Sequence, residues 1–383
     1  MHNPFITEEH ELTRRIVREF AEREIKPVAK KIDLENWYPR QILQRAAQLG
    51  LLEPTVQENG KVRNCINAVI IQEEISRVSA SCGSLINVQS GLASDPISIF
   101  GTEEQKKTYL EPLTKGEKIG CFCLTEPCCG SDAAAIQTKA KKENDHYVLN
   151  GRKTYITQGM YADIFIVFAR TKGQETGARG ITAFIVERDR TVETTPIETM
   201  GHRGTGLAEI TFNDTKIPKE NILGWEGQGF KIAMETLNVG RVRFAARGIG
   251  IATAALEESL EYAKQRKAFG KTIAEHQAIQ FTLADMLTDI EQTRLTTYYA
   301  AWLFDNNNQK YKTYASIAKL AAARLAVETT RKATHILGGF GYTKESTSER
   351  LYRDAKLLEI AEGTNEIQKL IIAKTLLTNQ IIL

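Results

Sequence analysis

The sequence lacks most features that mark secreted, membrane-spanning or disordered proteins. Its longest apolar run, Ile164–Ala169, is far shorter than the roughly 18 residues of a membrane-spanning helix. The first residues, MHNPFITEEHELTRR, contain no apolar signal-peptide core. Only six cysteines are present and none forms a CxxC pair, so we expect reduced thiols in a cytoplasmic compartment. We therefore exclude secreted, transmembrane and disulfide-stabilised classes.

The sequence also lacks a strong charge of either sign. Fifty Lys and Arg residues against 47 Asp and Glu leave a formal net charge of +3, too small to predict a polyanionic partner. We expect no nucleic acid and no membrane among its partners. Hydrophobic residues make up 42% and charged residues 25%, as in ordinary globular proteins. At about 100–200 residues per domain, the 383 residues predict two or three folded units.

Hydrophobic periodicity divides the chain into three regions and predicts an α+β multidomain fold. Residues 8–116 show helical spacing, as in Thr13–Ile25 and Cys65–Val78. Residues 121–223 have a β pattern, and helical spacing returns from residue 229, for example from Ile279 to Ile290. We place the domain limits at 1–118, 119–228 and 229–383.

The middle region predicts antiparallel strands. Asn150-Gly151 lies between Tyr147–Leu149 and Lys153–Thr157, and this dipeptide suits the positive φ angles of a type I′ hairpin turn. Further strands are expected at Asp163–Ala169, Gly180–Val186, Thr191–Ile197 and Glu209–Asn213. Successive strands separated by turns favour an antiparallel barrel or sandwich over βαβ units.

Two common kinds of site are not indicated. The six histidines form no HExxH or paired-ligand motif, and adjacent Cys128 and Cys129 cannot easily chelate one tetrahedral ion, so we predict no metal site. Gly248-Ile249-Gly250 resembles the start of a dinucleotide fingerprint but follows no predicted strand. Close packing between helices explains these glycines better.

Three segments could carry chemistry, and each has an ordinary structural alternative. Thr125 and Ser131 flank a Pro/Gly turn that could donate hydrogen bonds to a flat polar ring or a phosphate, or could simply cap the turn. Arg266 suits a pyrophosphate but could end a solvated helix. Glu362 lies between apolar residues and a glycine, where a raised pKa would suit a general base, although an acid at a helix end is commoner.

Together these segments resemble one family, the acyl-CoA dehydrogenases, over almost the whole chain. The four matching motifs, in order, are CLTEPCCGSDAAA (123–135), GRKTYITQG (151–159), QRKAFGKTI with HQ following (265–277), and HILGGFGYTKESTSERLYRDAKLLEIAEGTNEIQ (335–368). The resemblance implies a homotetrameric flavoprotein with an N-terminal helical domain, a middle antiparallel β-domain and a C-terminal four-helix bundle. FAD would lie between the β-domain and the bundle, with part of its site supplied by a neighbouring subunit.

The resemblance also implies which residues contact FAD. Those expected near the flavin ring are Phe122, Leu124, Thr125, Ser131, Tyr155 and Thr157. Those expected near the adenine dinucleotide, across the subunit interface, are Arg266, Phe269, Gln277, His335, Gly338 and Gly339. Thr364 and Glu366 should touch the cofactor after the catalytic turn.

The implied reaction is α,β-dehydrogenation of an acyl-CoA thioester to the trans-2-enoyl-CoA, with an electron-transfer flavoprotein as acceptor. Glu362 matches the base, and its backbone N–H should stabilise the thioester oxygen. Some family members place the base just before the arginine that matches Arg241, but here that residue is Gly240. Substrate contacts are expected from Ser131, Asn238, Arg241 and Gly363.

The acyl group is predicted to be a short, branched or cyclic saturated group rather than a diacid. Gly83 stands where a glutaryl specialist would need a cation, and Ala361 precedes the base where Tyr is frequent. Val88 and Leu92, which should face the acyl tail, are apolar. The alternatives are an acyl-carrier-protein-linked dehydrogenase or an acyl-CoA oxidase of the same fold. A non-catalytic, nucleic-acid-binding relative is disfavoured by the near-neutral charge and by Glu362.

Overall fold

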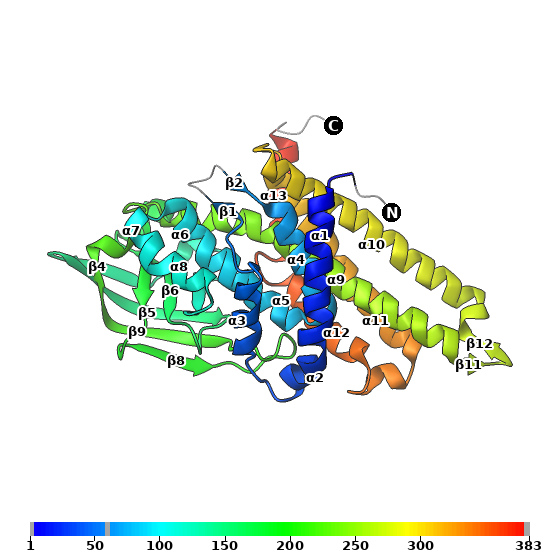
Figure 1. Ribbon diagram of the computed structural model, residues 1–383. Helices are drawn as coiled ribbons and strands as arrows, with labels where there is room; N and C mark the ends of the chain where they lie inside the picture. The colour runs from blue at the N-terminus through cyan, green and yellow to red at the C-terminus, as the bar shows by residue number, and fades with distance from the viewer. Residues whose placement is uncertain (1–3, 58–61, 379–383) are drawn as a thin grey trace.

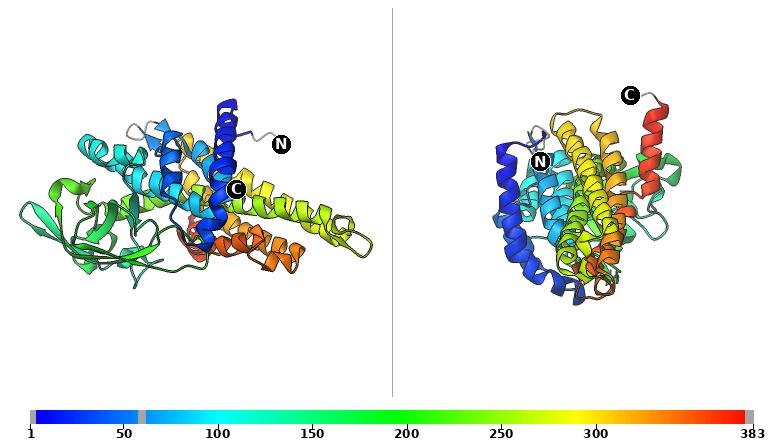
Figure 2. Two further views of the ribbon diagram at one scale, coloured as in Figure 1. Left: turned by 60° about the horizontal axis from the view of Figure 1, so that its bottom comes forward. Right: turned by 90° about the vertical axis from the view of Figure 1, so that its right-hand side faces the viewer.

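The computed structural model describes residues 4–57 and 62–378 (Figure 1). A β-sheet lies at one end of the molecule and two long helices, α9 and α10, extend to the other end, as the first view of Figure 2 also shows. The N-terminal helices pack between them. This arrangement confirms the predicted order of helical, β and helical regions.

The N-terminal region is helical, and the predicted helix Cys65–Val78 forms as α4 with those bounds. The helix α1 begins at a capping box in which the Thr7 hydroxyl accepts from the His10 backbone N–H. π-helical turns at Ala21–Ile25, Val88–Ala93 and Lys106–Leu110 join successive helices. The elements are α1 (Glu8–Phe20), α2 (Lys26–Leu34), α3 (Arg40–Gln48), β1 (Val56–Gln57), β2 (Val62–Arg63), α4, α5 (Ala80–Asn87), α6 (Ser94–Phe100), α7 (Glu103–Gln105) and α8 (Glu111–Thr114).

The middle region forms an eight-stranded sheet. Its strands are β3 (Gly120–Cys123), β4 (Lys139–Glu143), β5 (His146–Ile156), β6 (Ile164–Arg170), β7 (Ile181–Glu187), β8 (Val192–Pro196), β9 (Ala208–Pro218) and β10 (Ile222–Leu223). Their order is β10-β7-β6-β4-β5-β9-β8, with β3 paired to β6. The pairs are antiparallel except that β3, and one residue pair of β4, run parallel to β6. The four strands expected after the hairpin correspond to β6, β7, β8 and β9.

The hairpin predicted at Asn150-Gly151 is wrong. The strand β5 runs through this dipeptide without turning, and its register against β9 shifts between Leu149 and Gly151. Asn150 faces two residues of β9, Asn213 and Asp214, so the extra residue of this β-bulge lies in β9, where Asp214 has a φ of 51°. At Gly151 a Cβ would lie 2.5 Å from the Thr138 hydroxyl oxygen, which explains the glycine. The true turn lies between β4 and β5, where Asn144 has a φ of 54°.

The strand β6 is buried on both faces, which explains its continuous apolar sequence. Ile164, Ile166 and Phe168 pack towards α6, α8 and the start of α9, whereas Phe165 and Val167 pack into the interior of the β-domain. Because side chains alternate along a strand, both faces are covered by apolar groups. The β-domain is thereby fixed against the helices that carry the candidate site.

The C-terminal region consists of long helices: α9 (Gly229–Gln265), α10 (Gln277–Asp305), α11 (Tyr311–Leu337), α12 (Thr347–Ala355) and α13 (Asn365–Leu377), with the short ladder β11 (Lys267–Ala268) and β12 (Lys271–Thr272). Gly248 and Gly250 lie in the middle of α9. A Cβ on Gly250 would lie 2.3 Å from the Glu73 carbonyl oxygen on α4, and one on Gly248 2.7 Å from the Ala322 carbonyl oxygen on α11. This confirms that these glycines permit close helix packing. Across residues 4–57 and 62–378, no helix has the length and apolar character needed to cross a membrane.

Candidate active site

The turn that carries Glu362 connects a short 3₁₀ segment, Lys356–Glu359, to α13. Glu362 and Gly363 both have positive φ angles, of 54° and 92°. For Glu362 this conformation is uncommon and needs support from the surrounding structure. The Gly363 carbonyl oxygen provides it by accepting hydrogen bonds from Lys319 Nζ at 2.7 Å and Gln368 Nε2 at 2.9 Å.

The carboxylate of Glu362 points into the protein with one oxygen unused. Oε1 accepts a hydrogen bond from Asn87 Nδ2 at 3.1 Å. Oε2 is buried and has no hydrogen-bond partner among the described residues. An unsatisfied buried carboxylate oxygen carries a desolvation cost, which is typical of a group that acts on a ligand.

Gly240 on α9 lies directly against this oxygen. A Cβ at position 240 would be 2.5 Å from Glu362 Oε2 and 3.6 Å from Leu92 Cδ2. The two sequence positions at which the family is expected to carry its base therefore meet at one point in space. A side chain at position 240 would therefore exclude the Glu362 carboxylate from its present place.

Burial and nearby cations act in opposite directions on Glu362. Burial raises its pKa above the usual range of a carboxyl group, and four cations oppose that rise: Arg247, Arg243, Lys319 and Arg241. The same burial lowers the pKa of Arg247 to about 10 and that of Lys319 to about 8, with Glu362 opposing both shifts. Glu362 is thus a buried carboxyl group surrounded by buried cationic side chains.

Sequence reasoning missed Arg243 and Arg247. Each looks like a solvated cation on a helix, but both are almost completely buried. Arg243 donates to the Asp95 carboxylate and to Ser90, and Gly91 leaves room for its guanidinium, since a Cβ there would be 1.9 Å from Nη2. The sequence signal was the absence of flanking polar residues along residues 239–252 of α9.

The surroundings of Gly83 are closely packed. The absence of a cation at this position predicted that the acyl group carries no distal carboxylate. In the structure Gly83 packs against Ser76 of α4, where a Cβ would be 2.2 Å from the hydroxyl oxygen. The absence of a distal carboxylate stays a prediction.

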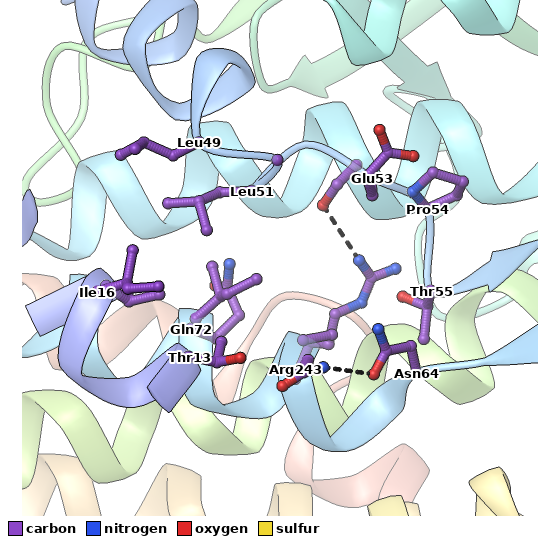
Figure 3. A pocket seen from close by; sticks show the side chains of 16 residues that line it. Thr13, Ile16, Leu49, Leu51, Glu53, Pro54, Thr55, Asn64, Gln72 and Arg243 are labelled. Carbon is purple, nitrogen blue, oxygen red and sulfur yellow. Dashed lines mark hydrogen bonds between the residues drawn. The ribbon is translucent and has the colours of Figure 1, made fainter. Parts of the chain in front are cut away.

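A cavity of about 180 Å³ lies on the outer side of Arg243 (Figure 3). It is enclosed by α1, the Leu49–Thr55 segment and α4, and Gln72 and Ser90 also line it. Arg243 lines this cavity and also acts electrostatically on Glu362. Its volume would hold about six water molecules at roughly 30 Å³ each.

The residues expected near the flavin ring lie together on the β-domain. The Thr154 backbone N–H donates to the Thr125 carbonyl oxygen at 2.9 Å, which joins the loop after β3 to the end of β5. Tyr155 is 65% exposed with a φ of 58°, so an aromatic ring stands free beside this loop. The hydroxyls of Thr125, Ser131 and Thr157 make no hydrogen bond within the described chain.

The residues expected near the adenine dinucleotide lie elsewhere. Arg266 and Phe269 belong to the β11–β12 hairpin at the opposite end of the molecule from the sheet (Figures 1 and 2). Gln277 begins α10, and His335, Gly338 and Gly339 end α11 at the same end of the helices. Phe269 is 96% exposed, and in the described residues neither the Arg266 guanidinium nor the Gln277 amide has a hydrogen-bond partner. One chain does not bring the two predicted sets together.

The remaining predicted residues are distributed as follows. Thr364 caps α13 by accepting from the Ile367 backbone N–H, and Glu366 is exposed and pairs with Lys369. Asn238 Oδ1 accepts from Arg241 Nη1 at 2.6 Å, so these two expected substrate contacts are joined on α9.

One group of potential metal ligands occurs among the described residues. The ligand atoms of Glu126, Cys128 and Cys129 lie within 4.8 Å of one another. Both Glu126 oxygens are already engaged: Oε1 by Lys153 Nζ and the Thr138 backbone N–H, and Oε2 by the Gln137 backbone N–H. This carboxylate therefore has a structural role in the loop after β3.

Comparison with known proteins identifies the family. The models for the acyl-CoA dehydrogenase N-terminal, middle and C-terminal domains match residues 7–117, 121–215 and 227–377. The chain therefore belongs to the acyl-CoA dehydrogenase family of flavoprotein oxidoreductases, as its sequence motifs predicted.

Three relatives illustrate the similarity. A short-chain-specific acyl-CoA dehydrogenase of Clostridium acetobutylicum is 43% identical, with 96% of this chain and 98% of the relative covered. A 3-(aryl)acrylate reductase of Clostridium sporogenes is also 43% identical, with 97% and 100% covered. The structure of butyryl-CoA dehydrogenase from Megasphaera elsdenii superimposes with a TM-score of 0.93 at 38% identity and covers 97% of this chain and 99% of that one.

Proposed function

We propose that this protein oxidises a short acyl-CoA thioester to the trans-2-enoyl-CoA, with Glu362 as the catalytic base. The observation that carries this proposal is the buried, unpartnered Oε2 of Glu362. A carboxylate whose pKa is raised by burial is a stronger base than an exposed one and is matched to proton removal near neutral pH. In this role Oε2 takes the proton from the carbon next to the thioester carbonyl.

The backbone of the same turn would stabilise the enolate that develops. The Glu362 backbone N–H donates to no acceptor within the described residues, and the positive φ of Glu362 sets its direction. An N–H held in place beforehand stabilises negative charge on the thioester oxygen as it appears. Lys319 and Gln368 support this geometry because both hold the Gly363 carbonyl.

The residues fit FAD, which when bound would supply the acceptor for the hydride that leaves the β-carbon. The free hydroxyls of Thr125, Ser131 and Thr157 and the exposed ring of Tyr155 suit the edge and face of a flavin ring. Arg266 and Gln277 are free to bind phosphates and polar groups of the other half of the cofactor. Because the two sets lie at opposite ends of one chain, we propose that two subunits complete each site within a homotetramer.

The acyl group is proposed to be short. Leu92 and Gly240 lie beside Glu362 and leave room for a small apolar group, and the short-chain and butyryl-CoA relatives act on acyl groups of this size by name. The branched or cyclic shape expected from Ala361, an electron-transfer flavoprotein as acceptor and a cytoplasmic location remain part of this proposal. So do the domain limits at 118/119 and 228/229.

The visible spectrum of the purified protein tests the proposal. Anaerobic addition of butyryl-, isobutyryl-, cyclohexanecarbonyl- and octanoyl-CoA should bleach a bound flavin, with the short members fastest. Rapid reoxidation by oxygen would instead indicate an acyl-CoA oxidase, and bleaching only by acyl carrier protein thioesters would indicate a carrier-linked enzyme. Failure to bind FAD, or a flavin left oxidised by every thioester, would contradict the proposal.

A second candidate is the reverse reaction, reduction of a 2-enoyl thioester. It is favoured by the name of the Clostridium sporogenes relative, a 3-(aryl)acrylate reductase. The same residues serve both directions because Glu362 would then return the proton. Reoxidation of chemically reduced enzyme by crotonyl-CoA and cinnamoyl-CoA, followed at the flavin band, distinguishes the preferred direction and substrate.

A further inference from the structure

One face of α9 continues from the Glu362 carboxylate into the protein interior. Gly240, Phe244 and Arg247 recur at +4 and +7, so they share this face. Gly240 touches Glu362 Oε2, and the Arg247 guanidinium lies over the Phe244 ring at 4.8 Å. With a rise of about 1.5 Å per residue, the backbone of Arg247 lies roughly 10 Å along the helix from Gly240.

The helix α5 contacts both Glu362 and Arg247. On α5, Asn87 donates to Glu362 and Ser84, one turn earlier, accepts from Arg247 Nη1 at 2.8 Å. The carboxylate and the guanidinium therefore lie one turn of α5 apart. An acyl group that presents its α-carbon to Glu362 and extends along α9 meets Arg247 after a few further carbons.

Arg247 is a buried cation whose hydrogen-bonding capacity is poorly used. It is 2% exposed, donates to the Ser84 hydroxyl and, at 3.4 Å, to the Gln72 amide, and its Nε has no partner among the described residues. Two other buried arginines are better satisfied. Arg243 is ion-paired with Asp95, and Arg170 donates to three backbone carbonyls.

A chain of hydrogen bonds through Ser84 and His202 fixes the position of the Arg247 guanidinium. Because Ser84 Oγ accepts from Arg247, its own proton is free for His202 Nδ1 at 2.8 Å, and His202 Nε2 then donates to the Asp354 carbonyl oxygen at 3.1 Å. Burial and the Arg247 charge lower the pKa of His202 to about 3, so His202 is neutral and adds no charge. This network holds the guanidinium without neutralising it.

The charges near Glu362 do not balance. Four buried cations, Arg241, Arg243, Arg247 and Lys319, face three buried carboxylates, Glu362, Asp95 and Asp354. Asp354 acts on Arg247 only at longer range, and in the described residues neither Arg241 nor Arg247 has a carboxylate within 4.0 Å. Buried charges are normally paired. A ligand that brings a carboxylate to this point would complete the pairing.

We propose that Arg247 ends the acyl site and binds a carboxylate at the far end of the acyl group, so that the preferred substrate is a short ω-carboxyacyl-CoA. This inference rests on the proposed function and names its substrate class, replacing the branched or cyclic acyl group given there by one that ends in a carboxylate. Arg243 does not take this role because Asp95 already occupies it. The reaction at the α- and β-carbons is unchanged, and the distal carboxylate takes no part in bond making.

The test compares substrates of matched shape. Glutaryl-CoA is paired with 5-methylhexanoyl-CoA, and adipoyl-CoA with 6-methylheptanoyl-CoA, since an isopropyl group replaces each carboxylate with little change in size. For the wild-type holoenzyme we expect a kcat/KM ratio in favour of the carboxyacyl member of at least one pair. In Arg247→Gln that ratio should fall about 10- to 100-fold, the effect of one buried hydrogen bond to a charged group.

Two further variants separate specificity from stability. Arg247→Lys keeps the charge and should restore part of the ratio. Arg350→Gln removes a half-buried arginine on α12 that donates to the Val78 carbonyl, and it should leave the ratio unchanged. Dissociation constants of glutaconyl-CoA and crotonyl-CoA for the oxidised enzyme, followed by the shift of the flavin spectrum, give the same comparison without turnover.

Each outcome is decisive. A wild-type enzyme that oxidises the neutral members and shows no preference for either carboxyacyl member overturns the inference but leaves the proposed function standing. A carboxyacyl preference that persists in Arg247→Gln overturns the role of Arg247. A flavin that no thioester reduces contradicts the proposed function itself.

Discussion

Replacing Glu362 by Gln is the most direct perturbation of the site, because it removes the proposed base and nearly preserves the shape of the side chain. Asn87 Nδ2 can still donate to the remaining amide oxygen, as it does to Oε1 at 3.1 Å, so we expect the turn and the bound flavin to be retained. The amide cannot accept the α-proton. General-base catalysis typically contributes about 10²- to 10⁴-fold, and the rate of anaerobic flavin reduction by butyryl-CoA should fall by that factor.

Stopped-flow absorbance at the flavin band measures this rate without contributions from the electron acceptor. Glu328→Gln is the matched control, since Glu328 is a surface acid paired with Arg331 on α11, and it should reduce at the wild-type rate. A rate within about threefold of wild type in Glu362→Gln would refute the assignment of the base, because proton transfer contributes much more than that.

The position of Gly240 extends the same reasoning. A Cβ there would lie 2.5 Å from Glu362 Oε2, so a glutamate at 240 in the wild-type background must displace the existing carboxylate. In the double variant Glu362→Gly, Gly240→Glu, the space is free and part of the lost rate should return. If the double variant is no faster than Glu362→Gly, the two positions are not equivalent places for the base.

Three further predictions follow from the same geometry. Burial raises the pKa of Glu362 above the ordinary carboxyl value of 4.5, and the proposed base acts only when deprotonated. A pH–rate profile should therefore show kcat/KM falling on the acid side with an apparent pKa above 4.5. An apparent pKa at or below that value would contradict this prediction. Burial lowers the pKa of Lys319 to about 8 from 10.5, so between these values the folded protein binds fewer protons than the unfolded chain. In denaturant titrations, the free energy of unfolding of the wild type should therefore rise relative to that of Lys319→Met between about pH 8 and pH 10.5, by up to about 3 kcal/mol. A difference between the two proteins that does not change with pH would show that Lys319 does not titrate in that range. Gly250→Ala should cost about 1–3 kcal/mol, because its Cβ would lie 2.3 Å from a backbone oxygen, whereas Gly130→Ala, with 3.9 Å to its nearest neighbour, should be nearly neutral in thermal unfolding.

The errors of the sequence-based prediction have physical reasons. Asn150-Gly151 was taken for a turn because the dipeptide tolerates positive φ, but it lies inside a continuous strand, opposite a β-bulge of β9. Only the pairing of β5 with β4 and β9 shows this. The strand β3 covers only Gly120–Cys123, directly before the LTEP residues, and was not predicted as a separate strand, since four residues are too few to show a period. Strands β6 to β9 were found because their apolar residues are regular and their ends carry turn residues.

What the sequence determined by itself was the architecture, the family and the identity of the candidate base. These depend on periodicity and on motifs that are contiguous in the chain, such as the segment around Glu362. Only the tertiary structure showed that Gly240 and Glu362 meet, that the two predicted sets of cofactor residues lie at opposite ends of one chain, and that Arg243 and Arg247 are buried beside the candidate base. The charge and reactivity of a side chain depend on its burial and on neighbours that are distant in sequence, and these are fixed only when α5, α9 and the turn before α13 pack together.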